Sequence, residues 1–313
     1  MTATRAATHP QMRSTRCAIC DREGGAAERW PATLDLEAFT ARAFSARRMP
    51  DRVHYRIVAC ETCGLVRSDP VAGDDLLASL YANSTFDYGS EVESIQVTYD
   101  RALGWLEARA PRRGALLEIG CGNGFFMRCA QRRGWSEVCG VEPSADAVAK
   151  APEEVKGTIV QDVMRRGLFA AESFDAVCLF QVLDHIPDPV ALLEECFAVL
   201  RPGGHILALN HNVSAWSARL LGERSPIVDV EHTYLYSPIT MRRVFAKAGF
   251  ADLRVRSVRN TYSVAYLAQL VPFPARIKSR VLPILRSGPA GRVRLTVPLG
   301  NLCLIARKPA SAT

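Results

Sequence analysis

The segment that most constrains the fold is a glycine-rich loop, Gly120–Gly124, which lies between two apolar runs. Leu116–Ile119 before it is typical of a buried strand, and Phe125–Met127 after it begins a helical pattern. Glycines adopt turn conformations closed to other residues, and a loop that leads into a helix leaves N–H groups open to a ligand. The acid Glu142 follows about twenty residues later, where it can bind the two hydroxyls of a ribose. The sequence therefore predicts a site for a nucleoside-containing ligand.

The spacing within this loop distinguishes between nucleoside cofactors. Dinucleotide-binding loops read G-x-G-x-x-G, whereas this loop reads G-x-G-x-G and follows the acid Glu118. A carboxylate there suits a ligand that carries an ammonium group better than one that carries a pyrophosphate. The loop resembles the first motif of the class I S-adenosylmethionine (SAM)-dependent methyltransferases. Further segments resemble later motifs of that family in the same order, within residues 97–260: Gly140–Ser144, Gln161–Val163, Phe174–Val177 and Leu200–His205.

The resemblance implies both a cofactor and the residues that bind it. The cofactor is SAM, which has an amino-acid tail and a sulfonium. Asp162 and Val163 match the position that contacts adenine in this family. The full set of residues expected to bind the cofactor is Glu118, Gly120, Cys121, Gly122, Asn123, Gly124, Glu142, Pro143, Asp162, Val163, Phe180 and Gln181.

Strand and helix patterns alternate through the middle of the chain. This alternation predicts an α/β fold with a doubly wound, mostly parallel sheet, and the resemblance implies seven strands in a Rossmann-like arrangement. Ser144 and Asp188 are expected helix N-caps, the latter followed by a proline. The expected strands are 115–119, 138–142, 157–161, 174–180, 205–210, 251–259 and 301–306. The expected helices are 74–81, 94–108, 125–133, 144–151, 188–200 and 237–249.

Four cysteines near the start form two C-x-x-C pairs, Cys17 with Cys20 and Cys60 with Cys63. Two intervening residues let both sulfurs of a pair reach one metal ion, and four thiolates complete a structural zinc site. The gap between the pairs is longer than is usual for such sites, so an insertion is expected between them. The arrangement resembles the N-terminal zinc ribbon of some bacterial methyltransferases, which implies a structural Zn²⁺. A redox role is a weaker alternative, because no strand-to-helix context surrounds either pair.

These patterns predict how the chain is divided. No apolar run is long enough to span a bilayer, and the basic start has no apolar stretch behind it, so a cytoplasmic protein is expected. The expected parts are a disordered tail (1–16), the zinc ribbon (17–70), a linker with lead-in helices (71–110), the SAM-binding catalytic domain (111–260), and a basic helical cap with a final strand (261–313).

Positive charge is concentrated at the C-terminal end. Residues 251–313 carry a net charge of +10, whereas the whole chain carries +7. An apolar, aromatic stretch, 262–273, directly precedes the cationic stretch 276–282. Three interpretations remain open: a helical cap on the fold, a lid that attracts an anionic acceptor, or peripheral contact of residues 262–282 with an anionic membrane.

The resemblance implies in-line transfer of a methyl group to a nucleophile, with alignment and exclusion of water providing much of the catalysis. A general base is needed where the nucleophile loses a proton. Three histidines are candidates for this base: His185, His211 and His232. His185, which follows the fourth core strand, is the first choice, and His232 is the second. Each of these histidines could instead have a structural role. Asp184 stands where the family often has Glu.

The favoured function is SAM-dependent methylation of O, C or N on a small molecule such as a metabolite, a sugar or a lipid precursor, which could be anionic or lipid-linked. A zinc-containing RNA methyltransferase is the alternative, although the ribbon lacks the dense basic and aromatic surface of RNA-binding modules, so a nucleic-acid partner is not expected. A non-catalytic SAM-binding protein is the third possibility. The sequence carries no transferable code for the acceptor.

Overall fold

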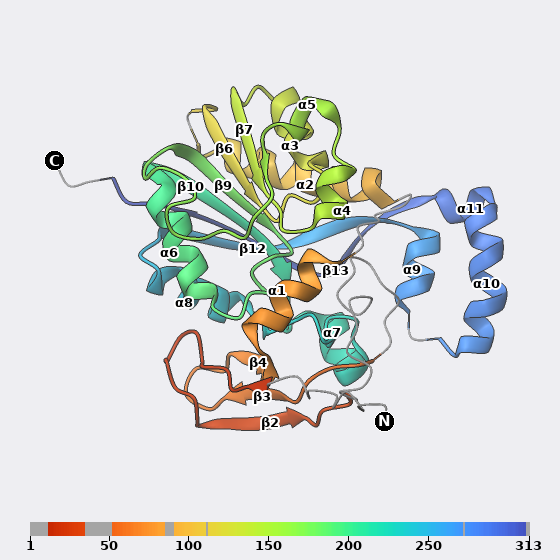
Figure 1. Ribbon diagram of the computed structural model, residues 1–313. Coiled ribbons are helices and arrows are strands. Elements are labelled where there is room, and N and C mark those ends of the chain that lie inside the picture. Colours follow the sequence, from red (N-terminus) through yellow and green to blue (C-terminus); the bar gives the residue numbers. More distant parts are fainter. Residues whose placement is uncertain (1–11, 35–51, 85–90, 111, 272, 311–313) are drawn as a thin grey trace, which may run out of the picture.

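The computed structural model describes residues 12–34, 52–84, 91–110, 112–271 and 273–310 (Figure 1). Its centre is a seven-stranded sheet in which β13 runs antiparallel to β10 and β12, while the other pairs of neighbouring strands are parallel. This confirms the predicted doubly wound, mostly parallel α/β fold. The strands, in spatial order, are β12 (Ala251–Ser263), β13 (Arg294–Arg307), β10 (Leu200–His211), β9 (Phe174–Phe180), β6 (Ala115–Ile119), β7 (Glu137–Val141) and β8 (Ile159–Val160).

Helices cover both faces of this sheet because the buried strands are apolar on both sides. In β6, Leu117 and Ile119 belong to the core shared with α6 (Pro189–Val199) and α8 (Pro238–Lys247). Leu116, directly before Leu117, belongs to the opposite core, with α2 (Val92–Glu107) and α3 (Phe125–Arg132). Shorter helices are α4 (Ala145–Ala149), α5 (Glu153–Lys156) and α7 (Trp216–Leu221), followed by a 3-10 turn at Gly222–Arg224.

The expected helix caps are present. The Ser144 side chain accepts a hydrogen bond from the Ala147 N–H at the start of α4. Asp188 accepts from the Ala191 N–H, with Pro189 in the first turn of α6. Several boundaries differ from the prediction. In this part of the chain, α4 ends early and is followed by the unpredicted α5, β8 keeps only two residues of the expected strand 157–161, and β10 begins at Leu200 instead of 205.

The N-terminal part forms a separate four-stranded sheet below the large one (Figure 1). Its order is β11 (Tyr234–Leu235), β4 (Val66–Ser68), β3 (Ile57–Cys60) and β2 (Ala26–Trp30). The edge strand β11 comes from the catalytic part of the chain and pairs with β4. The small sheet is therefore joined to the catalytic part by backbone hydrogen bonds, which the sequence did not predict.

The beginning of the chain differs from the expected disordered tail. Met12–Arg13 forms β1, which pairs with β5 (Val71–Ala72), because Arg13 and Thr15 find partners there: Arg13 with Asp74, and the Thr15 N–H with Asp69. Residues 12–16 are thus ordered, and the rest of that predicted tail, residues 1–11, lies outside the described residues. Helix α1 (Asp74–Ala82) follows β5, close to its predicted range.

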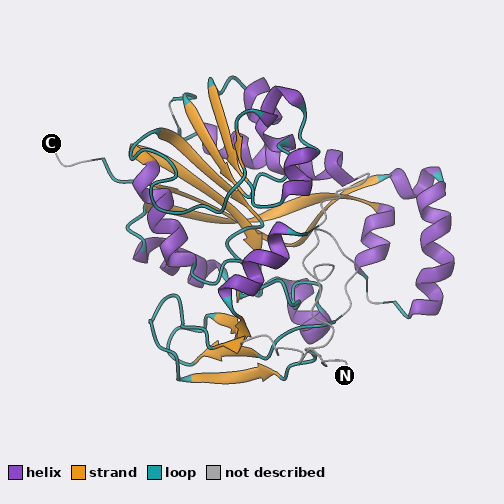
Figure 2. Cartoon of the chain, in the orientation of Figure 1, coloured by secondary structure: helices purple, strands orange, loops and turns teal. Residues whose placement is uncertain are grey.

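The last two strands are longer than predicted, since β12 reaches Ser263 and β13 begins at Arg294. Their paired outer ends extend beyond the sheet and carry α9 (Val264–Leu270), α10 (Ala275–Ser287) and α11 (Pro289–Arg292). We call residues 260–297 the C-terminal arm; its helices stand apart from those that cover the sheet (Figure 2). Within the described part of the chain, no helix combines the length and apolar character needed to cross a bilayer.

Candidate active site

A cavity of about 1090 Å³ lies at the carboxyl ends of β6, β7, β9 and β10. Open α/β sheets bind ligands at this edge. Eight of the twelve residues expected to bind the cofactor line it: Gly120, Gly122, Glu142, Pro143, Asp162, Val163, Phe180 and Gln181. The other four, Glu118, Cys121, Asn123 and Gly124, lie on the same strand, loop and helix start without lining the cavity.

The glycine loop needs its glycines for two separate reasons. Gly120 and Gly124 have φ angles of 69° and 74°, in the left-handed region that favours glycine. A Cβ on Gly120 would also lie 2.5 Å from Cγ2 of Val182, so the loop packs directly against the segment that follows β9. Gly124 is the N-cap of α3 and has no side chain to cap that helix, which leaves N–H groups at the helix start for a ligand.

Two carboxylates flank this loop. Glu142 accepts hydrogen bonds from the N–H groups of Gly122 and Ser144, both at 2.9 Å. Burial raises the pKa of Glu142, and these two hydrogen bonds oppose the rise. Glu118 is 2% exposed, and its pKa is raised well above the ordinary value by burial and by the charge of Glu142. Among the described residues, Glu118 Oε2 has no hydrogen-bond partner.

The remaining cofactor candidates lie on the two sides of the loop. Asp162 is held by Arg165, whose Nη2 lies 2.9 Å from Oδ2, and this hydrogen bond lowers the pKa of the carboxyl. Val163 beside it is 49% exposed. Phe180 stacks on Tyr99 of α2 with ring centroids 4.0 Å apart. Gln181 has a φ of 57°, and its buried Oε1 has no hydrogen-bond partner in the described parts of the chain.

Three of the six histidines of the chain gather around Asp184, and all three line the cavity. Asp184 Oδ2 lies 2.8 Å from His211 Nδ1, and Oδ1 lies 3.7 Å from His185 Nε2. The His232 ring lies 4.8 Å from that of His185 and 4.7 Å from that of His211, between centroids. Asn210 Nδ2 donates to Asp184 Oδ1 at 2.8 Å. We call Asp184, His185, His211 and His232 the imidazole cluster.

The electrostatics of this cluster favour a charged aspartate and a neutral imidazole. Burial alone would raise the pKa of Asp184, but the hydrogen bond from His211 and the nearby His185 outweigh it and lower that pKa. Burial lowers the pKa of His185, and the charge of Asp184 opposes this only in part. The hydroxyl of Tyr81 lies 3.1 Å from His185 Nδ1. His185 is therefore held by two neighbours, and its lowered pKa favours the neutral imidazole, which is the form that can accept a proton.

The cluster also includes residues that the sequence prediction did not assign. The prediction named His185 and His232 and compared Asp184 only with the family pattern. It missed the pairing of Asp184 with His211, and it missed Tyr81. Asp184 and His185 are neighbours in the sequence, but His211 and His232 lie on other segments, so the cluster gives no sequence motif. The available signal was that His185 follows β9 and that His211 ends β10, two strands that end at the same edge of the sheet.

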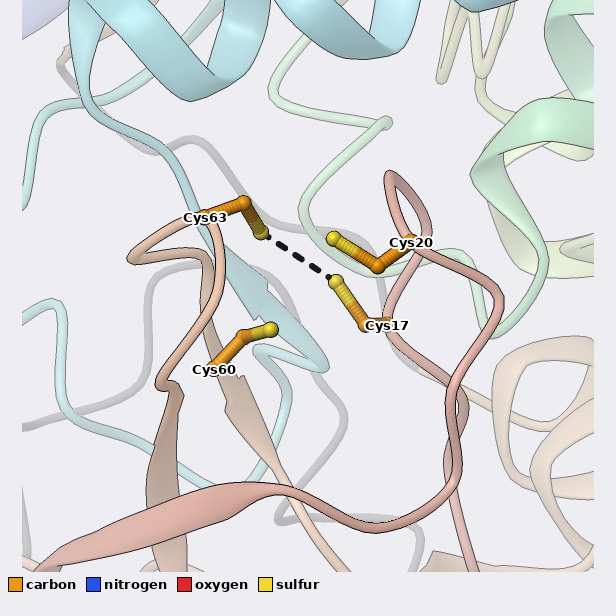
Figure 3. A group of neighbouring side chains, drawn as sticks. All are labelled: Cys17, Cys20, Cys60 and Cys63. Atoms are coloured by element: carbon orange, nitrogen blue, oxygen red, sulfur yellow. Dashed lines mark hydrogen bonds between the residues drawn. The ribbon is translucent and has the colours of Figure 1, made fainter.

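The four cysteines of the two C-x-x-C pairs converge in the small N-terminal sheet (Figure 3). Their sulfurs lie within 4.8 Å of one another, and Sγ of Cys17 lies 3.4 Å from Sγ of Cys63. A tetrahedral zinc–thiolate site places sulfurs about 3.8 Å apart, given Zn–S bonds near 2.3 Å. All four are reduced in the structure, and the donor set fits one structural zinc ion.

The small sheet supports one member of the imidazole cluster. Ser68 of β4 donates its hydroxyl to the carbonyl of His232 at 2.7 Å, and its N–H donates to the Thr233 carbonyl at 2.8 Å. Thr233 N–H in turn donates to the Asp184 carbonyl at 2.8 Å. The cysteine-bearing sheet therefore fixes the backbone on which His232 stands.

The glycine loop, the two carboxylates and the cavity beside them define a SAM-dependent methyltransferase. Residues 93–255, more than half of the chain, match the family model described as a methyltransferase domain, and the chain belongs to that family.

Two relatives are ubiquinone biosynthesis O-methyltransferases. The one from Cupriavidus pinatubonensis is 27% identical over 191 residues, which cover 56% of this chain and 76% of the relative. The one from Ralstonia nicotianae is 29% identical over 150 residues, which cover 45% and 63%; the chain thus spans less than two thirds of that relative. Among solved structures, a putative methyltransferase from Bacillus halodurans is similar at 19% identity and a TM-score of 0.49, covering 67% of this chain and 99% of that one.

Proposed function

We propose that this enzyme transfers the methyl group of SAM to a hydroxyl oxygen of a small, largely apolar acceptor. The observation that carries the proposal is the imidazole cluster, which faces the same cavity as the glycine loop. Attack by a hydroxyl releases a proton, so a base beside the acceptor is required. The relatives that are named as O-methyltransferases support oxygen over nitrogen or carbon.

We call the part of the cavity beside the glycine loop the cofactor half, and the part beside the imidazole cluster the acceptor half. The residues of the cofactor half fit SAM. The buried Glu118 oxygen that lacks a partner among the described residues is suited to an ammonium group, and the N–H groups at the start of α3 to a carboxylate. Glu142 would hold the ribose hydroxyls, with Asp162 and Val163 near the base. SAM supplies a methyl group on a sulfonium, which leaves as a neutral thioether when the acceptor oxygen attacks.

The acceptor half is lined by aromatic and apolar side chains as well as the histidines. They come from α1, α7 and α9 and include Tyr81, Trp216, Leu220, Tyr266, Leu267 and Leu270. Such a lining favours an aromatic or long-chain acceptor over a free sugar. A cavity of this kind also favours a small molecule over a folded RNA.

We assign the general base to His185. Its N–H donates to the carbonyl of Val182 at 2.9 Å, and Val182 packs against Gly120, so the His185 segment adjoins the cofactor loop. In the proposed step the acceptor hydroxyl gives its proton to His185 as the oxygen–methyl bond forms. Asp184 stabilises the imidazolium that results, and the rings of His232 and His211 lie beside it.

The experiment is methyl transfer from labelled SAM to hydroxylated aromatic and prenylated acceptors, compared with total RNA. Each histidine of the cluster is replaced in turn by Asn, with His205→Asn as the control, because His205 lies in a separate cavity near Asp252. We expect His185→Asn to lower kcat by about 10²- to 10⁴-fold with SAM affinity unchanged. Transfer only to RNA would overturn the proposed acceptor class, and an unchanged kcat would remove His185 as the base.

We also propose that the four clustered cysteines hold one structural zinc ion in an N-terminal ribbon. The sulfur spacing and the knuckle turns support it. Metal analysis of the freshly purified enzyme should give one zinc per chain, lost in Cys60→Ser/Cys63→Ser. A zinc content well below one per chain would contradict the proposal.

A further inference from the structure

The C-terminal arm has an inner side that belongs to the active-site cavity. Tyr266, Leu267 and Leu270 of α9 line this cavity, as does Val271 directly after the helix. Tyr262, at the outer end of β12, also lines it, with its ring centroid 5.3 Å from that of Tyr266. The arm is therefore one wall of the acceptor half.

The outer helix of the arm carries an exposed apolar stripe. Ile277, Val281 and Ile284 of α10 are 46%, 40% and 70% exposed. Their spacing of four and then three residues places them on one face of a helix, whereas Leu282 on another face is buried. We call Ile277, Val281 and Ile284 the outer stripe. Contiguous apolar surface of this kind on a water-facing helix usually marks an interaction site.

The segment that carries the outer stripe contains only positive charges. Residues 264–292 contain five Lys or Arg and no Asp or Glu. Arg276 and Arg280 are exposed and lie next to the stripe along α10. Lys278 and Arg286 are turned toward α9, where their side chains donate to the carbonyl and the side-chain oxygen of Gln269. An apolar stripe bordered by arginines complements a surface that is apolar inside and negative at its rim.

We propose that the C-terminal arm docks on an anionic membrane surface, with α10 lying in the interface and the outer stripe turned into the lipid. The helix has 13 residues, which is too short to cross a bilayer but suits an interfacial position. The arginines beside the stripe would pair with lipid phosphates, and their attraction falls off within a Debye length.

This docking would bring the wall of the acceptor half to the membrane. An acceptor with an apolar tail could then pass from the lipid along α9 into the cavity while its hydroxyl reaches the imidazole cluster. This second part rests on the proposed function, whereas docking itself does not depend on catalysis.

The test is co-sedimentation of the full chain with vesicles of phosphatidylcholine alone and of phosphatidylcholine mixed with phosphatidylglycerol. We expect binding only to the anionic vesicles, weakened by salt. Arg276→Gln/Arg280→Gln should weaken it about 30-fold, on the basis of two basic side chains near the lipid surface. Ile277→Ser/Val281→Ser/Ile284→Ser should also weaken it. The control is Ile239→Ser, since Ile239 is 65% exposed on α8, and it should bind as the wild type does.

Failure to pellet with anionic vesicles would overturn the proposal, as would equal binding by the stripe variant. Light scattering measures the oligomeric state of the wild type and of the stripe variant. If the wild type is a dimer and the stripe variant is a monomer, the outer stripe is a subunit interface, and this result would also overturn lipid docking. Methyl transfer to a water-soluble acceptor, measured separately, should be unchanged in the stripe variant, so a failure of docking and a failure of the proposed function are distinguishable.

Discussion

The two halves of the active-site cavity are built in different ways. The cofactor half comes mainly from one strand, one loop and one helix start, together with the acid at the end of the next strand. The acceptor half is assembled from α1, the segments after β9 and β10, the His232 segment that borders the small N-terminal sheet, and α9 of the arm. The cofactor half therefore depends on one short sequence motif. The acceptor half depends on several segments that are distant in the sequence and on the contacts that hold them together.

This comparison predicts a large effect on turnover from Asp184, which lies at the centre of the imidazole cluster in the acceptor half. Replacing Asp184 by Asn removes the negative charge that holds His211 and stabilises a protonated imidazole. We expect kcat to fall by about 10²-fold or more, because the whole cluster loses its shared partner. SAM affinity, measured by calorimetry, should stay within about twofold.

Asp146→Asn provides the control, since Asp146 makes an exposed ion pair with Lys150 on α4. Its turnover should equal that of the wild type. Loss of SAM binding in Asp184→Asn would mean that the two halves are not separable.

The second prediction concerns the cofactor half. Glu118→Gln removes the buried carboxyl that we propose to pair with the ammonium group of SAM, so SAM affinity should fall by about 10- to 100-fold, typical of a lost charge-assisted hydrogen bond. Burial and the charge of Glu142 raise the pKa of Glu118. A protonated carboxyl cannot pair with the ammonium group as a carboxylate does, so SAM affinity should decrease as the pH falls toward that raised pKa.

Calorimetry across pH measures both effects. The Gln variant should lose the pH dependence as well as the affinity, while Glu154→Gln, at an exposed position on α5, should retain both. An affinity of the wild type that is independent of pH would show that Glu118 is already charged in the free enzyme.

The difference between a site built from one stretch of chain and a site built from distant segments also explains how much could be predicted from the sequence. The sheet, most of its helices and the cofactor loop were predictable because strand periodicity, glycine spacing and helix caps are local signals. The Cys17 and Cys60 pairs were predictable for the same reason. The pairing of His211 with Asp184 was not, because it depends on which strands end side by side. Nor was β11, a two-residue strand whose partner β4 is more than 160 residues away along the chain.

The smallest predicted effect tests whether the small N-terminal sheet matters for the acceptor half. The Ser68 hydroxyl donates to the His232 carbonyl at 2.7 Å, in a buried position. Ser68→Ala leaves that carbonyl without this donor, at a cost of about 1 kcal/mol, so kcat should fall roughly fivefold while SAM affinity is kept. Ser173→Ala removes an exposed hydroxyl that donates to the Ala170 carbonyl, and it should leave kcat unchanged. If Ser68→Ala lowered thermal stability but not kcat, the sheet would stabilise the fold without positioning His232. A loss confined to kcat would show that the small N-terminal sheet, far from the glycine loop in the sequence, sets the geometry of the acceptor half.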